Sequence, residues 1–264
     1  MLTSVPASDV PGAGGTALRS VFDGFRWGLD RMLSVAYGVV YDYIYERFSP
    51  YGVLQGEVLE LVEAARPHGV DRREVRVLDV GCGPGALTCA LAEAGFTVTG
   101  LDAYGALVEV AKEKRRTKRL ANLTFRQADL ARGNTFRNDL FDQVVNIHSL
   151  YVHAAPDRLV SEAYRVLKPG GHAVFVNHTR RVGQWSTLRE IWQLNGFAAA
   201  LRAVLWVLPN AVFEAARSRT GPHYWDEAAF AAHLRESGFT ILELRRTFLR
   251  GSSLLVWARK GGAA

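Results

Sequence analysis

Short apolar runs alternate with amphipathic stretches along the chain from residue 75 to residue 177. The apolar runs have the length and the β-branched content of buried strands, and the stretches between them have helical spacing. The predicted strands are Val75–Val80, Thr97–Leu101, Leu123–Gln127, Gln143–Ile147 and His172–Asn177. This alternation is typical of a doubly wound parallel sheet with helices on both faces.

The alternation continues to the end of the chain with one interruption. The predicted helix Pro156–Leu167 leads through a Pro-Gly-Gly turn at residues 169–171 into the fifth strand. A helical, tryptophan-containing segment from Val182 to Gly221 then breaks the order. The elements predicted after it are a helix at Asp226–Ser237 and strands at Thr240–Leu244 and Leu254–Ala258. The sequence therefore predicts an α/β fold, a Rossmann-like and mostly parallel sheet with a helical insertion before the last two strands.

A helical addition precedes the sheet. Charged and apolar residues interleave at helical spacing from Val21 to about Arg66. Pro50 is predicted to end one helix before a second forms over Val53–Ala65, because the residue before a proline is disfavoured in helical conformation.

Composition sets limits on this picture. The chain has 264 residues, enough for one sizeable α/β core and too few for two full enzyme domains. Its 32 basic and 26 acidic residues give a net charge of +6 on a mixed surface, which does not indicate a nucleic-acid partner. The only two cysteines, Cys82 and Cys89, do not form a disulfide framework and fit a cytoplasmic location.

Neither a signal peptide nor an integral membrane segment is expected. The first fifteen residues lack a basic region followed by an apolar run. The longest apolar stretch, Phe197–Ala216, is interrupted by Arg202, Pro209 and Glu214.

A glycine-rich loop follows the first predicted strand. Gly81, Gly83 and Gly85 permit a sharp turn and a close backbone approach to a ligand at the start of the next helix. Asp102 follows the second strand, where a carboxylate can accept hydrogen bonds from both hydroxyls of a ribose. Because Gly81, Gly83 and Ala86 also satisfy the dinucleotide pattern, a dehydrogenase is a rival prediction.

Three features favour a different cofactor. Asp79 lies inside the first strand, where an acid suits a cationic, amine-bearing ligand better than a pyrophosphate. Asp129 follows the third strand, at an edge where it can hold the exocyclic amine of adenine. The run EAYRVLKPGG before the fifth strand continues the sheet.

With these motifs the chain resembles the class I S-adenosylmethionine-dependent methyltransferases of the small-molecule type, which include the ubiquinone and menaquinone C-methyltransferases. The resemblance is strong from Val75 to Asn177 and weak over the final two strands. It implies S-adenosylmethionine as cofactor, with a glycine loop, a ribose-binding acid and an adenine-side acid. The residues that match these roles are Asp79, Gly81, Gly83, Gly85, Asp102, Asp129 and the backbone of Leu130.

Together with the predicted elements, the resemblance divides the chain into five expected parts. The expected parts are a flexible tail (1–20), an N-terminal helical lid (21–70), the S-adenosylmethionine-binding core (71–181), a helical insertion that serves as an acceptor lid (182–224) and the C-terminal part of the core sheet (225–264). The insertion carries Trp185, Trp192 and Trp206 with few charges, enough to cover an apolar pocket. Packing against the sheet, or contact with a membrane surface, is the alternative for this segment.

Methyl transfer is an in-line displacement that needs a well-placed acceptor and, for a phenol or enol, a base. His148 and His153, just beyond the fourth strand, are the predicted catalytic residues, and His178 is a further candidate. The alternative for His148 is backbone contact with the cofactor, and for His153 a capping role at the next helix. No metal site is predicted.

The acceptor is expected to be a hydrophobic small molecule, such as a quinone precursor, a phenol or another secondary metabolite. The fourth strand ends in Asn146-Ile147-His148-Ser149 and lacks the Asn/Asp-Pro-Pro-aromatic motif of many nucleic-acid N-methyltransferases. No nucleic-acid partner is therefore expected. A lipid methyltransferase with peripheral membrane contact and a non-catalytic cofactor-binding protein are the alternatives, and the oligomeric state is not predicted.

Overall fold

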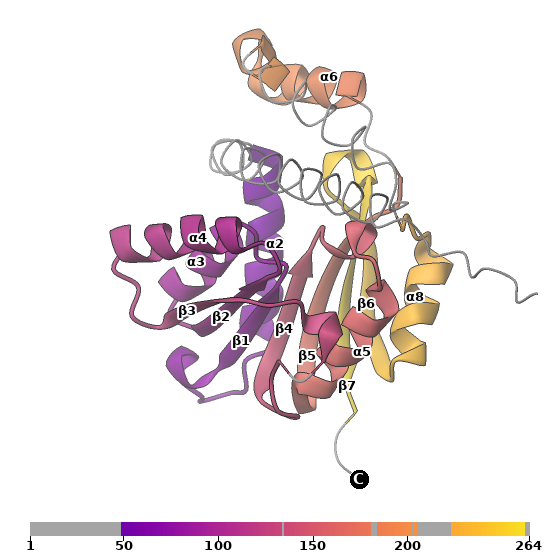
Figure 1. Cartoon of the computed structure of the whole chain (residues 1–264). Helices are drawn as coiled ribbons and strands as arrows, with labels where there is room; N and C mark the ends of the chain where they lie inside the picture. Colours follow the sequence, from indigo (N-terminus) through magenta and orange to yellow (C-terminus); the bar gives the residue numbers. More distant parts are fainter. Residues whose placement is uncertain (1–48, 134, 181–183, 202, 205–222, 262–264) are drawn as a thin grey trace, which may run out of the picture.

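The computed structural model describes residues 49–133, 135–180, 184–201, 203–204 and 223–261 (Figure 1). The strands are β1 (Arg76–Val80), β2 (Thr97–Asp102), β3 (Leu123–Gln127), β4 (Phe141–Ile147), β5 (Leu167–His178), β6 (Phe239–Thr247) and β7 (Ser253–Lys260). The α-helices are α2 (Ser49–Ala64), α3 (Ala86–Glu93), α4 (Gly105–Thr117), α5 (Pro156–Val166), α6 (Gln184–Asn195) and α8 (Glu227–Glu236). Short 3-10 turns are η1 (Arg72–Glu74), η2 (Leu130–Arg132), η3 (Leu150–Val152) and η4 (Leu249–Gly251).

The strands form a seven-stranded sheet in the order β3-β2-β1-β4-β5-β7-β6. Strands β1 to β5 run parallel, and β7 runs antiparallel to both β5 and β6. The predicted fold class, a Rossmann-like and mostly parallel sheet, is confirmed. The strand order reverses between β1 and β4, and open sheets of this kind bind ligands beyond the carboxyl ends of the strands at such a point.

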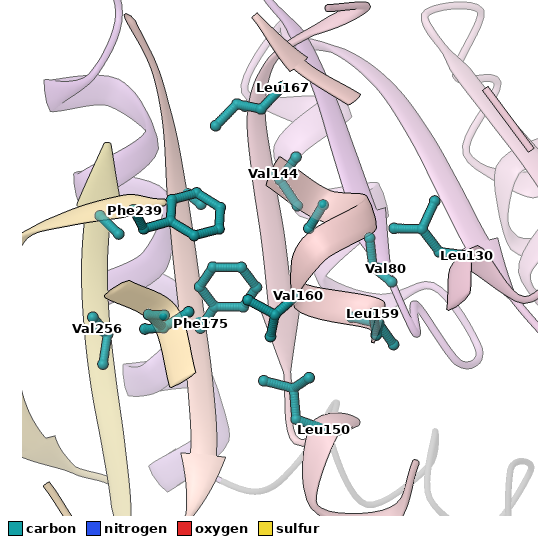
Figure 2. Close-up of a cluster of buried hydrophobic side chains, with 14 of the residues drawn as sticks. Val80, Leu130, Val144, Leu150, Leu159, Val160, Leu167, Phe175, Phe239 and Val256 are labelled. Atoms are coloured by element: carbon teal, nitrogen blue, oxygen red, sulfur yellow. The ribbon is translucent and has the colours of Figure 1, made fainter. Parts of the chain in front are cut away.

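Two apolar clusters fix the layers on either side of the sheet. On one face, α5 and α8 pack against the sheet, and Figure 2 shows Val160 of α5 beside Phe175 of β5. On the other face, α2, α3 and α4 pack through residues such as Val58, Leu91 and Val108. The continuous apolar runs of strands such as β1 and β4 therefore reflect their burial on both sides.

Two local predictions differ from the structure. The predicted turn at residues 169–171 lies within β5, where Phe141 pairs with Leu167 and the register then shifts before Gln143 pairs with His172. The glycines thus accommodate an irregularity of the strand instead of separating it from the helix. Pro50 lies within α2, so this helix already includes Ser49 and does not start at the predicted Val53. The helix that Pro50 was expected to end lies outside the described residues.

The predicted insertion is described in part. Its helix α6 lies between β5 and α8 in sequence and stands away from the sheet in Figure 1. Ile191 of α6 is buried with Tyr51 and Phe248 against it. Residues 1–48 and Trp206 lie outside the described residues, so the tail, most of the N-terminal lid and this tryptophan stay predictions. Within the described part of the chain, no helix is long and apolar enough to cross a membrane.

Candidate active site

The glycine loop turns directly after β1 and is tied to β2. The backbone N–H groups of Gly81 and Cys82 both donate to the carbonyl of Leu101, at 2.7 and 3.0 Å. Gly81, Gly83 and Gly85 have φ values of 71°, 52° and 80°, in the left-handed region that favours glycine. The loop therefore depends on glycine for its backbone conformation.

The three glycines differ in what surrounds them. A Cβ on Gly81 would lie 2.5 Å from the Cβ of Ser149, and one on Gly85 would lie 2.7 Å from the ring of Phe125. A Cβ on Gly83 would meet none of the described atoms within 4 Å. The outer two glycines thus allow close packing, whereas the middle one faces open space that a ligand can occupy.

Asp79 is a buried acid beneath this loop. Its Oδ2 accepts a hydrogen bond of 2.6 Å from the hydroxyl of Thr88 in α3. Burial raises the pKa of Asp79 to about 7, the Thr88 hydrogen bond opposes that rise, and the negative charge of Asp102 adds to it. A cationic group bound nearby would favour the ionised form of Asp79 and would itself be stabilised.

Asp102 ends β2 and lies directly beside the loop. Its Oδ2 accepts from the backbone N–H of Gly83 at 2.9 Å, and its Oδ1 accepts from that of Tyr104 at 2.9 Å. The carboxylate therefore holds the loop and the start of α4 together at the edge where the sheet order reverses.

Asp129 and His153 form a second hydrogen-bonded unit at this edge. Asp129 precedes η2, and its Oδ1 accepts from the N–H of Ala131 at 2.9 Å and lies 3.1 Å from Nε2 of His153. Nδ1 of His153 accepts from the N–H of Ala155 at 3.0 Å, which assigns the ring proton to Nε2 and makes it the donor to Asp129. Both ring nitrogens of His153 are thus engaged. Leu130, the next predicted site residue, is buried.

His148 follows β4 and precedes Ser149, the residue that lies against Gly81 of the loop. It adopts a positive φ of 51°, and its backbone N–H donates to the carbonyl of Val176 at 2.8 Å. Its neighbour Ser149 packs against Gly81, and Asn146 donates to the carbonyl of Val80 at 2.8 Å. The end of β4 is therefore anchored to the end of β1.

The rings of His148 and His178 stack with their centroids 3.9 Å apart and an interplanar angle of 7°. Burial, and then the neighbouring His178, lower the pKa of His148 well below its ordinary value. Burial lowers the pKa of His178 to about 4, against an opposing hydrogen bond with the backbone of Ser252. Both rings are therefore neutral near pH 7. Tyr151 meets His178 edge to face at 4.8 Å, and Phe248 lies 5.0 Å from His148.

The structure thus brings the predicted acids, loop and histidines to one edge of the sheet, in three hydrogen-bonded or stacked groups. Sequence reasoning missed Ser149, Phe248 and Ser253. Ser253 pairs with His178 across two antiparallel strands, 75 positions apart in the chain, and no local pattern announces such a pairing. The described residues contain no cluster of histidine, cysteine and acidic side chains that could hold a metal ion.

Comparison with known proteins gives the family. Residues 78–175 match the methyltransferase domain family. The chain is 36% identical over 138 residues to a phosphatidylethanolamine N-methyltransferase of Cereibacter sphaeroides, a match that covers 52% of this chain and 67% of that protein. The chain belongs to the S-adenosylmethionine-dependent methyltransferases. The resemblance inferred from the motifs and the predicted cofactor, S-adenosylmethionine, are confirmed, and the rival dehydrogenase prediction is rejected.

Other relatives of this methyltransferase differ in their named substrates. It is 33% identical over 141 residues to a phthiotriol/phenolphthiotriol dimycocerosates methyltransferase of Mycobacterium leprae, covering 49% of this chain and 50% of that one. It is 37% identical over 108 residues to a demethylmenaquinone methyltransferase of Tropheryma whipplei, covering 40% and 43%. The methyltransferase therefore spans only about half of these two relatives.

Solved structures share the fold. Magnesium protoporphyrin IX methyltransferase of Synechocystis, solved with bound S-adenosylhomocysteine, superposes with a TM-score of 0.55 at 20% identity, covering 81% of this chain and 84% of that one. The cyclase SpnF superposes with a TM-score of 0.57 at 20% identity, covering 78% and 81%. At such identity the likeness extends to the fold alone.

The raised pKa of the buried Asp79 can be tested by the pH dependence of stability in the absence of cofactor. Its pKa in the folded protein, about 7, lies above the ordinary 3.8, so its stabilising contribution is complete below about pH 4 and is lost as the pH rises through 7. Asp79→Asn removes this dependence while keeping an acceptor for Thr88. Relative to the wild type, the variant's free energy of unfolding should therefore increase from pH 5 to pH 8 in urea titrations. The exposed Glu60→Gln is the control for loss of a carboxylate, and a pH-independent difference for Asp79→Asn would refute the assignment.

Proposed function

We propose that this methyltransferase transfers the methyl group of S-adenosylmethionine to a hydroxyl or enol of a hydrophobic small molecule, such as a quinone precursor, a phenol or another secondary metabolite. The observation that carries the proposal is the pair of neutral, stacked histidines beside the glycine loop, with Tyr151 and Phe248 around them. A largely aromatic site with few polar groups suits an apolar acceptor. The relatives named for demethylmenaquinone and for phthiotriol/phenolphthiotriol dimycocerosates support a hydrophobic acceptor. A cytoplasmic location is part of the proposal.

The cofactor side is assigned to the residues predicted from the motifs. Asp79 would face the ammonium group, the loop of Gly81, Gly83 and Gly85 would pass close to the ligand, and Asp102 would accept from the ribose hydroxyls. The open side of Gly83 next to Asp102 supports this fit. The bound cofactor supplies an electrophilic methyl group on a sulfonium.

The adenine side is assigned to Asp129 and the backbone of Leu130, and the backbone of His148 would line the cofactor. His153 donates to Asp129 and accepts from Ala155. The only ring nitrogen of His153 with a free lone pair, Nδ1, already accepts a hydrogen bond from the backbone of Ala155. His153 is therefore better suited to orienting Asp129 than to acting as a base. Of the two predicted catalytic histidines, His148 is the better candidate for the base.

A second candidate function is methylation of a lipid at a membrane surface. The relative from Cereibacter sphaeroides is named for a phospholipid substrate. Several large apolar side chains of the insertion are exposed: Trp185, Trp192, Phe197 and Leu201. Such residues can insert into a lipid interface, or can form the rim of a lid over an apolar acceptor.

Methyl transfer from radiolabelled S-adenosylmethionine separates these functions. The acceptors offered are 1-naphthol, a reduced naphthoquinone, and vesicles of phosphatidylethanolamine with phosphatidylglycerol. We expect label in the product of a hydroxylated aromatic and none in the lipid. Label in phosphatidylethanolamine alone would support the second function. If a metabolite extract also yields no labelled product although S-adenosylhomocysteine binds, the protein is a non-catalytic cofactor-binding protein.

Trp192 tests the proposed role of the insertion as an acceptor lid. Because its side chain is 58% exposed, Trp192→Ala should change the free energy of unfolding by no more than about 0.5 kcal/mol. If the insertion covers the acceptor, the variant should raise the acceptor's KM several-fold. The affinity for S-adenosylhomocysteine should stay within about threefold, because the cofactor and the acceptor contact different walls of the site. Leu242→Ala, another exposed apolar truncation, is the control. Unchanged acceptor kinetics would reject the lid.

A further inference from the structure

One hydroxyl links the two stacked histidines. The Oγ of Ser253 lies 2.9 Å from Nε2 of His148 and 3.0 Å from Nδ1 of His178. Ser253 is fully buried at the start of β7, directly across from His178 at the end of β5. The residue after β4, the last residue of β5 and the first residue of β7 thus form a hydrogen-bonded chain at the edge of the sheet that holds the glycine loop.

The other ring nitrogen of His148, Nδ1, makes no hydrogen bond with the described residues. This nitrogen is also buried. A buried polar atom without a partner costs on the order of 1–3 kcal/mol, so such an atom in a native protein requires an explanation. An atom that completes its hydrogen bond only when a ligand is bound is one such explanation, and His148 lies where the proposed function places the acceptor.

The hydroxyl of Ser253 between the two rings limits which nitrogens of His148 and His178 can carry a proton. The hydroxyl of Ser253 has one hydrogen to donate, so it can donate to one histidine and must accept from the N–H of the other. If it donates to His148, then Nδ1 of His148 carries a buried N–H without an acceptor. If it donates to His178, then His148 donates through Nε2 and its Nδ1 keeps a lone pair. Orphaned buried N–H groups are rarer than orphaned acceptors, which favours the second arrangement.

We propose that Ser253 is a positioning residue for the reaction: by bridging His148 and His178 it fixes the tautomer in which Nδ1 of His148 offers a lone pair to the hydroxyl of the acceptor. The proposal rests on the proposed function of His148 as the base. When the acceptor loses its proton, the O–H bond breaks, its electron pair stays on oxygen, and an N–H bond forms at Nδ1. The Nε2–H can then pass to Ser253, whose own proton passes to Nδ1 of His178, so that one proton is shared by the pair.

The surroundings of the pair agree with this role. Both rings are kept neutral by burial, so a lone pair is available near pH 7. In the described part of the chain, the two rings contact each other, the edge of Tyr151, the ring of Phe248 and the backbone of Ser252. Among the residues that the structure describes, no carboxylate is hydrogen-bonded to either ring, so the shared hydroxyl is the side chain that orients them.

Nitrogen-15 NMR of the histidine side chains tests the tautomer without an acceptor. Spectra are recorded on the wild type with saturating S-adenosylhomocysteine, and the two rings are assigned with His148→Gln and His178→Gln. We expect both rings to be neutral Nε2–H tautomers at pH 7. Ser253→Ala should give His148 a mixture of tautomers, Ser253→Thr should restore the single one, and Ser252→Ala, which removes the adjacent buried hydroxyl, should leave it unchanged.

Kinetics with 1-naphthol give the second readout. Ser253→Ala should lower kcat about 10- to 100-fold, within the range that positioned acid–base catalysis supplies, while the KM for S-adenosylmethionine stays within about threefold. An Nδ1–H tautomer of His148 in the wild type, or an unchanged tautomer in folded Ser253→Ala, would overturn the proposal. Failure of the proposed function is distinguishable, because 1-naphthol would then remain unmethylated whatever the tautomer.

Discussion

The hydrogen bonds that tie the glycine loop to β2 are the constraint on which the rest of the site depends. The Leu101 carbonyl receives two loop N–H groups, and Asp102, the next residue, receives the N–H of Gly83. These bonds hold the loop in a left-handed conformation between the ends of β1 and β2. Ser149 then fits against Gly81 because that residue has no side chain, which brings the end of β4 and His148 to the same edge.

Periodicity and motifs in the sequence were sufficient for the sheet, its largely parallel direction and the edge at which the acids gather. Parallel strands alternate with helices in chain order, so Asp79, Asp102 and Asp129 could be placed without knowing any distance. The irregular start of β5 was not predictable, because a Pro-Gly-Gly sequence fits a turn as well as a bulged strand. The pairing of Ser253 with His178 was also out of reach, since it depends on the register of the last two strands.

The fold alone does not determine which reaction is catalysed; the residues around the acceptor do. SpnF is named as a cyclase and Synechocystis magnesium protoporphyrin IX methyltransferase as a methyltransferase, yet both superpose on this chain at 20% identity. In this chain, the site carries a neutral histidine pair with a bridging hydroxyl, and α6 presents exposed aromatic side chains. A neutral imidazole with a fixed tautomer is chemically suited to an acidic hydroxyl, whereas a protonated one would repel the positively charged cofactor.

Isothermal calorimetry with S-adenosylhomocysteine tests most directly whether the loop and its acids hold the cofactor. The wild type should bind S-adenosylhomocysteine in the micromolar range and should not bind NAD. Asp102→Ala should weaken binding by about 1–3 kcal/mol, the scale of losing charged hydrogen bonds to hydroxyl groups. Because Asp102 also holds Gly83, unfolding of the unliganded variant is measured alongside. Binding of NAD without S-adenosylhomocysteine, or unchanged affinity in a folded Asp102→Ala variant, would contradict the assigned site.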